Sequence, residues 1–263
     1  QVKLVFYSLV LNHHQVHVAD EFYRLLGDDF SFVETTKCLD NKGVTEDYST
    51  RPYLLPSWKS KKAYEKAMLL ALNAEVCVFS GYQALPFEKA RMRKGLLSFD
   101  MGERMLKRGW LNLASPRILK MMMSYHFGGW SKKPLYKLCC GAFVAKDQYK
   151  LWSFNGKCFK WGYFTKVKEL KKEGFKLEES DEPVRFMWCA RFLNWKHPEM
   201  AVKLANRLKI DGYNFHLDMY GDGEMKPTIQ KLIDDFGLTD RICLKGIVPN
   251  EQILEAMANH DIF

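Results

Sequence analysis

Three strand-length apolar runs, each ending at a glycine or a cation, constrain the fold of residues 184–246 more than any other feature. The runs are residues 184–192, 214–220 and 241–244. Residues 199–209, which follow the first run, place their apolar side chains at helical spacing. Strands that alternate with helices in this way are typical of βαβ units with a parallel sheet. Because ligands of such sheets collect at the carboxyl ends of the strands, we expect Arg191, Gly221 and Gly246 to lie at a binding edge.

The N-terminal part of the chain shows the same alternation. Residues 3–10 read as a continuous apolar strand, residues 18–26 as a helix and residues 30–34 as the next strand. Residues 136–144 and 145–149 read as the last strand and helix of this part. The fold class that follows is α/β, with two Rossmann-like doubly wound domains.

The predicted domain boundaries follow the composition. We expect a first domain over residues 1–166, a charged linker over 167–183 that contains Gly174 and Pro183, and a second domain over 184–263. Residues 38–61 are polar and carry two prolines, so we expect a long loop there.

The order of motifs in residues 184–263 resembles the donor-nucleotide half of the retaining GT-B-fold glycosyltransferases of family four (glycosyltransferase group 1). That half has a strand ending in a small residue plus Arg, a Lys five residues later, a strand ending in Gly-x-Gly, and a strand followed by Gly and a hydrophobic-Pro step. In this chain the corresponding residues are Ala190-Arg191 with Lys196, then Gly221-Asp222-Gly223, and then Gly246 ahead of Ile247-Val248-Pro249.

The resemblance implies that the second domain binds a nucleoside-diphosphate sugar through Arg191, Lys196, Gly221, Gly223 and Gly246. The chemistry is consistent with this assignment. A Lys and a fork-shaped Arg bind diphosphate oxygens through charge-assisted hydrogen bonds and stabilise the leaving group. Glycines at strand ends allow backbone N–H groups to approach a phosphate or a base closely.

The first domain would then bind the acceptor. In many family members the loop after the first strand is glycine-rich, whereas this chain has Asn12, His13 and His14 there. A carboxylate at a strand end can orient an acceptor hydroxyl or take its proton, and Glu103 stands at such a position. We therefore predict His14 and Glu103 as catalytic residues; an ion pair between Glu103 and the adjacent Arg104 is the structural alternative.

We expect no metal and no cofactor apart from the nucleotide-sugar co-substrate. His13 and His17 are four residues apart, which is a possible zinc spacing, but no carboxylate or cysteine accompanies them locally. Seven cysteines without a C-x-x-C pair argue against a disulfide scaffold, and we expect Cys139 and Cys140 to be reduced core residues in a cytoplasmic protein.

Charge is unevenly distributed along the chain. Residues 1–165 hold 25 lysines and arginines against 14 acidic residues, whereas residues 166–263 hold 15 against 17. We predict that Lys107, Arg108, Lys132 and Lys133 belong to a basic, aromatic-bearing membrane or acceptor surface. No apolar run reaches the roughly 18 residues of a membrane span, so we expect a cytoplasmic protein that can be peripheral on the inner face of the membrane.

The predicted activity is transfer of a sugar, with retention, from a nucleoside-diphosphate sugar to a glycan or lipid-linked acceptor in cell-surface polysaccharide synthesis. Family members continue past the strand begun at Asp261 to two glutamates eight positions apart, which this sequence lacks. We therefore expect a C-terminally truncated chain with an incomplete second domain that is inactive by itself.

Two other classes remain open. A non-catalytic nucleic-acid-binding α/β protein would use the basic region, although no nucleic-acid-binding signature is present and we do not expect such a partner. A dinucleotide-dependent oxidoreductase ranks last, because Gly221-Asp222-Gly223 lacks the third glycine of the fingerprint.

Overall fold

The computed structural model describes residues 2–37, 47–165 and 182–263. The chain forms two compact units, residues 1–169 and 170–263, and each is described by itself. Most of the predicted linker, residues 167–183, lies outside the described residues.

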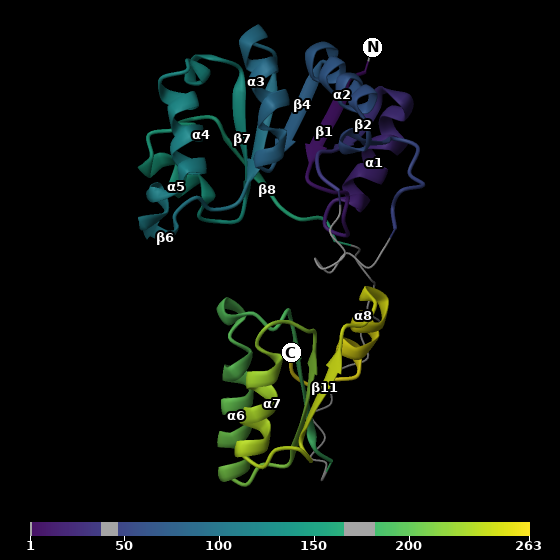
Figure 1. The fold of residues 1–263 in the computed structure, drawn as a ribbon, viewed down its shortest axis with the longest axis vertical. Coiled ribbons are helices and arrows are strands. Elements are labelled where there is room, and N and C mark those ends of the chain that lie inside the picture. Colours follow the sequence, from purple (N-terminus) through teal and green to yellow (C-terminus); the bar gives the residue numbers. More distant parts are fainter. Residues whose placement is uncertain (1, 38–46, 166–181) are drawn as a thin grey trace. The chain divides into compact units, whose positions relative to one another are not determined.

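The first unit is built on a seven-stranded sheet in the order β3-β2-β1-β4-β5-β7-β8, and every neighbouring pair of strands is parallel (Figure 1). The strands of this sheet are β1 (Leu4–Ser8), β2 (Phe30–Glu34), β3 (Leu54–Pro56), β4 (Val76–Ser80), β5 (Ser98–Gly102), β7 (Leu135–Cys140) and β8 (Cys158–Trp161). The predicted α/β class with a parallel sheet is confirmed.

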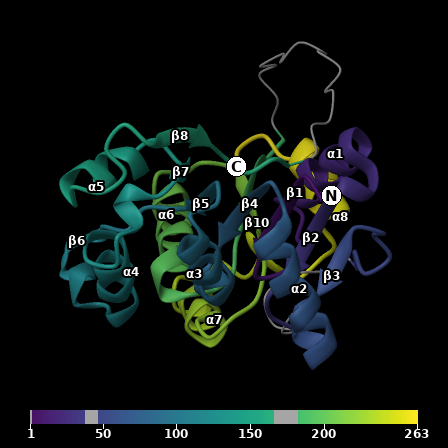
Figure 2. The same ribbon diagram turned by 90° about the horizontal axis from the view of Figure 1, so that it is seen from above.

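Helices cover both faces of this sheet, α1 on one side and α2 with α3 on the other (Figures 1 and 2). The helices of the unit are α1 (Val16–Leu26), α2 (Lys61–Asn73), α3 (Leu85–Lys94), α4 (Pro116–His126) and α5 (Val144–Lys150). Side chains that alternate along a strand therefore enter two cores. Phe6 packs with Phe32 on the α1 side, whereas Tyr7 packs on the α2 side and donates its hydroxyl to the carbonyl of Ala67.

Two strands of the sheet differ from the sequence-based prediction. Residues 38–61 were expected to be loop, but β3 forms the edge of the sheet and ends at Pro56. Strand β8 forms the other edge, although residues 136–144 were expected to hold the last strand. Both edge strands are short, with three and four residues, so they carry little periodicity for a sequence pattern to reveal. The short strand β6 (Lys107–Trp110) was not predicted either.

The second unit has a three-stranded parallel sheet in the order β11-β10-β9. Its elements are β9 (Val184–Cys189), α6 (Pro198–Ile210), β10 (Phe215–Tyr220), α7 (Lys226–Asp235), β11 (Ile242–Gly246) and α8 (Asn250–Ala258). Val202 of α6 and Ile229 of α7 pack on Leu217 and Met219 of β10 in a single apolar core. Figure 1 shows α6 and α7 next to each other along this sheet.

A buried arginine links three elements at the edge of the first sheet where β4 and β5 begin. Arg91 of α3 is fully buried, and its guanidinium donates hydrogen bonds to the carbonyls of Ala71, Ala74, Glu75 and Leu97 at 2.6–3.1 Å. Its Nε also donates to the hydroxyl of Ser98 at 3.0 Å, alongside the carbonyl bonds. One side chain thus joins the end of α2, the start of β4 and the start of β5.

Replacing Arg91 with methionine should lower the free energy of unfolding by about 3–5 kcal/mol, because buried carbonyls lose their donor. Arg24→Met is the matched control. Arg24 is exposed and pairs with Glu21 at 2.6 Å in solvent, so its loss should leave the free energy of unfolding nearly unchanged. Urea unfolding followed by circular dichroism measures both, and equal midpoints for the two variants would contradict this role of Arg91.

Candidate functional site

The carboxyl edge of the first sheet contains the point where the strand order reverses. Strand β1 lies between β2 and β4, and the connections that follow β1 and β4 lead to opposite sides of the sheet. Ligands of doubly wound sheets bind at such a point. The two loops touch here: a methyl group added to Gly81, after β4, would lie 3.1 Å from Cγ of Leu9, after β1.

A polar cluster lies at this edge and joins the two predicted catalytic residues. The ring of His14, after β1, lies 5.0 Å from the ring of Tyr163, after β8. The Tyr163 hydroxyl donates to Oε1 of Glu103 at 2.6 Å, and Lys107 donates to the other oxygen of that carboxylate. The backbone N–H of Phe164 donates to the His14 carbonyl at 3.1 Å and holds the β8 end against the β1 loop.

The electrostatics of the cluster set the protonation states of its members. The hydrogen bonds from Lys107 and Tyr163 hold the pKa of Glu103 below its ordinary value, so it is ionised at neutral pH. Burial, with the neighbouring His13, lowers the pKa of His14, which therefore presents a neutral imidazole. Burial and the nearby Glu103 raise the pKa of Tyr163, which stays protonated as a donor. A neutral imidazole and a carboxylate at one edge are suited to accept a proton.

The structural alternative for Glu103, an ion pair with the adjacent Arg104, is wrong. Arg104 does not pair with Glu103; it donates to both oxygens of the buried Asp147 carboxylate at 3.0 and 3.1 Å. Tyr163 was not predicted as part of the site, because an aromatic residue beyond the last strand carries no sequence signal for what it contacts. The rings of His13 and His14 are in contact, tilted by 50° with their centroids 3.9 Å apart. Within the described ranges there is no group of three or more metal-ligating side chains.

In the second unit, the loop after β9 lies against the turns after β10 and β11. The N–H of Ala190 donates to Tyr220, that of Phe192 to Asp222, and that of Gly221 to Gly246, at 2.8–3.1 Å. These bonds bring the predicted donor-binding segments together at one edge. Arg191 and Lys196 are exposed there, and neither forms an ion pair with another described residue.

The glycines of this edge have a packing reason that the sequence did not reveal. Gly221 adopts φ 129°, and a methyl group there would overlap the carbonyl oxygen of Ala190. At Gly223 a methyl group would lie 2.6 Å from the carbonyl oxygen of Phe192. The N–H of Gly223 already donates to the Asp222 carboxylate, and that of Gly221 to Gly246. Both N–H groups therefore act inside the protein, whereas the side chains of Arg191 and Lys196 are exposed.

The predicted basic surface lies on the first unit. Lys107 is occupied by Glu103, whereas Lys132 is exposed and the stem of Lys133 passes near Gly95. The side chain of Arg108 lies outside the described part of the chain. Large apolar side chains are exposed in the same segments; these are Trp110, Leu111, Leu119, Met123 and Phe127. No described helix combines the length and the apolar character needed to cross a bilayer.

Comparison with known families finds a match over the second unit. Residues 170–263 match the family described as glycosyl transferases group 1. The matched residues coincide with the second compact unit. No curated protein sequence matched this chain significantly.

Solved structures share the fold over both units. The lipopolysaccharide outer core galactosyltransferase WaaB, in its apo form, has a TM-score of 0.64 at 11% identity and covers 98% of this chain and 72% of its own. The Staphylococcus aureus MnaA–UDP structure has a TM-score of 0.58 at 11% identity and covers 100% of this chain and 73% of its own. A mutant of S. aureus TarM in complex with fondaparinux, alpha-GlcNAc-glycerol and UDP has a TM-score of 0.51 at 13% identity. The match covers 68% of this chain and 34% of TarM, so the chain spans about a third of TarM. These likenesses establish the GT-B-type, Rossmann-like fold.

The pKa of His14 should rise in a His13→Asn variant, because one of the two causes that lower it is removed. In the wild type, His14 contributes to the stability of the folded state above its ordinary pKa of 6.5. This contribution is lost as the pH falls through the lowered pKa that His14 has in the folded state. NMR titration of the His14 ring proton measures the midpoint. A His17→Asn variant serves as control and should leave it in place, and an unmoved midpoint in His13→Asn would leave burial as the sole cause.

Proposed function

We propose that the protein belongs to a system that transfers a sugar, with retention, from a nucleoside-diphosphate sugar to a glycan or lipid-linked acceptor. The observation that carries this proposal is the match to group 1 glycosyl transferases over the second unit, in which Arg191 and Lys196 are unpaired at the carboxyl edge of the sheet. A diphosphate leaving group gains charge as the bond to the sugar breaks, and two unpaired cations offset that charge.

The first unit supplies the acceptor side in this proposal. The acceptor oxygen forms a bond to the anomeric carbon, the bond from that carbon to the diphosphate breaks, and the acceptor proton must leave. Neutral His14 and ionised Glu103 are the two groups suited to receive it or to orient the hydroxyl. We propose no metal and no further cofactor. We assign residues 1–166 to the acceptor and residues 184–263 to the donor.

The structural neighbours support the choice of ligands. WaaB is named as a galactosyltransferase of lipopolysaccharide, and the TarM and MnaA structures contain UDP. A uridine diphosphate sugar is therefore the first donor to test, and cell-surface polysaccharide the first class of acceptor. Structures of UDP-N-acetylglucosamine 2-epimerases also share the fold, with a TM-score of 0.58 for the Listeria monocytogenes protein. An epimerase needs no acceptor, so conversion of the donor without an added acceptor would favour that second candidate.

We further propose that the protein is cytoplasmic and peripheral on the inner face of the membrane. Exposed Trp110 and Leu111 lie beside the basic segment that contains Lys107. Apolar anchors among cations are the combination by which a surface binds anionic lipid. The protein would then meet a lipid-linked acceptor at the membrane that holds this acceptor.

Arg191→Ala and Lys196→Ala should each weaken the binding of UDP by about tenfold, since each removes one charge-assisted contact to the diphosphate. Isothermal titration calorimetry with UDP measures the affinity. Lys231→Ala, an exposed lysine of α7, is the matched control and should bind as the wild type does. Unchanged affinity in both variants of the loop after β9 would contradict the donor assignment.

A Trp110→Ala and Leu111→Ser double variant should bind anionic phosphatidylglycerol vesicles about tenfold more weakly, because two apolar anchors are lost. Vesicle sedimentation measures the bound fraction, with phosphatidylcholine vesicles as the uncharged comparison. Leu25→Ser, which alters an exposed leucine of α1, is the control. Equal binding by all three proteins would contradict the membrane surface, and salt-sensitive binding to RNA in place of vesicles would support the nucleic-acid alternative.

A further inference from the structure

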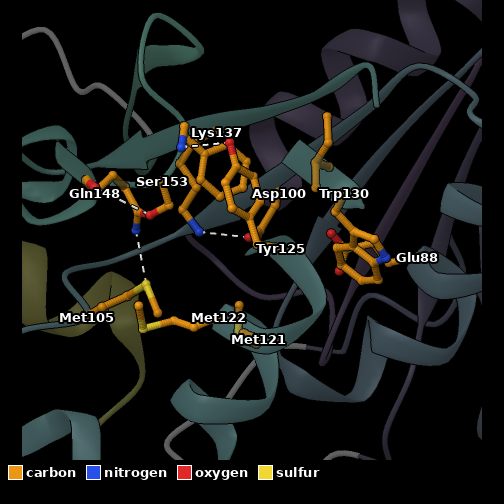
Figure 3. A pocket seen from close by; sticks show the side chains of 12 residues that line it. Glu88, Asp100, Met105, Met121, Met122, Tyr125, Trp130, Lys137, Gln148 and Ser153 are labelled. Atoms are coloured by element: carbon orange, nitrogen blue, oxygen red, sulfur yellow. Dashed lines mark hydrogen bonds and ion pairs between the residues drawn. The ribbon is translucent and has the colours of Figure 1, made fainter. Parts of the chain in front are cut away.

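A partly open cavity lies at the carboxyl edge of the first sheet, between β5, β7, α3 and α4 (Figure 3). Two adjoining hollows share Glu88, Asp100, Met105, Met121 and Lys137 in their walls. The larger has a volume of about 180 Å³ and also borders Glu103 and Gly81, so it opens toward the polar cluster described above. The smaller, of about 20 Å³, is the one drawn in Figure 3.

One carboxyl group in this cavity lacks a partner. Glu88 is 5% exposed, and its Oε1 is buried without a hydrogen-bond partner among the described residues. Asp100 and Lys137 stand opposite each other in the β5–β7 register and pair at 2.9 Å. Burial and the nearby Asp100 raise the pKa of Glu88 well above its ordinary value. An unpartnered carboxyl inside a protein costs free energy, so its position in the wall of a cavity points to a ligand.

Four other polar side chains of the lining, Tyr125, Gln148, Ser153 and Lys137, each have at least one partner within the protein. The Tyr125 hydroxyl accepts from the N–H of Phe154 at 2.8 Å. Gln148 accepts from Ser153 at 2.7 Å and donates toward the sulfur of Met105 at 3.0 Å, as Figure 3 shows. Among the described side chains that line the two hollows, Lys137 is the only cation, and Asp100 holds it.

The lining that the two hollows share thus carries two carboxyl groups, Glu88 and Asp100, against one cation, Lys137. A primary ammonium group brings a second positive charge and three N–H donors to the carboxyl oxygens, whereas a neutral hydroxyl brings no charge. The methionines Met105, Met121 and Met122, with the rings of Trp130 and Phe154, form apolar walls next to the acids. In Figure 3 these methionines fall on one side of the view and Asp100 with Lys137 on the other.

We propose that this cavity binds a primary ammonium group on a short apolar stem. The nitrogen lies at the carboxylates of Glu88 and Asp100, and the stem lies in the larger hollow, beside Met105 and Met121. The charged and titratable groups that face Glu88 are Asp100 from β5, Lys137 from β7 and Tyr125 from α4, with Glu103 at the mouth. On binding, Glu88 releases its proton to solvent and the ligand cation replaces it. The proposed site does not depend on the proposed sugar transfer. The amine can belong to a sugar acceptor or to another molecule.

The test compares three small molecules of equal length: n-butylamine, n-butanol and butyrate. They present a cation, a neutral hydroxyl and an anion on the same stem. Methionine residues labelled with ¹³C in the methyl group report on the cavity through Met105, Met121 and Met122 in NMR spectra of the full chain. We expect n-butylamine to shift these signals with an affinity at least about tenfold higher than that of n-butanol, and butyrate to be weakest. Equal or stronger binding of n-butanol or butyrate, or no shift with n-butylamine, would overturn the proposal.

The pH dependence identifies the group that binds. A protonated Glu88 must lose its proton when the amine binds, so the affinity for n-butylamine should rise as the pH rises above the ordinary glutamate range, by up to about tenfold per pH unit for as long as Glu88 is protonated in the free protein. The alkylammonium itself stays charged at neutral pH, since its pKa is near that of lysine, about 10.4. Glu88→Gln should remove both the preference and the pH dependence. Glu65→Gln, at an exposed position of α2, should retain both. Affinity that falls as the pH rises would show that Glu88 acts as a neutral donor, and would overturn the ammonium site.

Discussion

Parallel strand pairing is the constraint on which the rest of this structure depends. Parallel neighbours cannot be joined by tight turns, so helices must cross over and cover both faces of the sheet. All carboxyl ends then meet at one edge, which is how His14, Glu103 and Tyr163 come together from the ends of β1, β5 and β8. The same constraint brings the loop after β9 against the glycine turns of β10 and β11. In each unit the chemistry follows from the direction of the strands.

Two buried ionisable side chains near this sheet differ in how their polar atoms are satisfied. The guanidinium of Arg91 is surrounded by carbonyl oxygens and the Ser98 hydroxyl, so its burial is compensated and its role is structural. Glu88, one turn earlier on the same helix α3, faces a hollow and has an oxygen without a partner. Because a protein core normally satisfies its polar groups, the contrast within one helix separates a structural residue from a candidate ligand-binding residue.

The glycines of the second unit show how a motif can be located correctly for an incomplete reason. The sequence pattern places Gly221 and Gly223 at a strand end, as the structure confirms. The pattern interprets them as openings for phosphate, yet their N–H groups bond within the protein and their missing side chains admit the backbone of Ala190 and Phe192. The sequence shows where a glycine stands, but the atoms that a side chain there would clash with belong to the loop after β9, which is distant in the sequence.

The amino-acid sequence by itself determined the alternation of strands and helices, the α/β class and the edge at which polar residues gather, because apolar periodicity and turn residues act over short distances. It did not reveal β3 or β8, whose few residues pair only because a sheet is already present. The partner of Glu103 was also decided by the tertiary structure, since Lys107 and Tyr163 reach it from different elements while Arg104 turns to Asp147. Glu88 reads as one more charge on a basic helix, and only the packing of α3 against β5 and β7 buries it. Burial and pairing depend on contacts between residues far apart in the chain, and those contacts exist only in the folded protein.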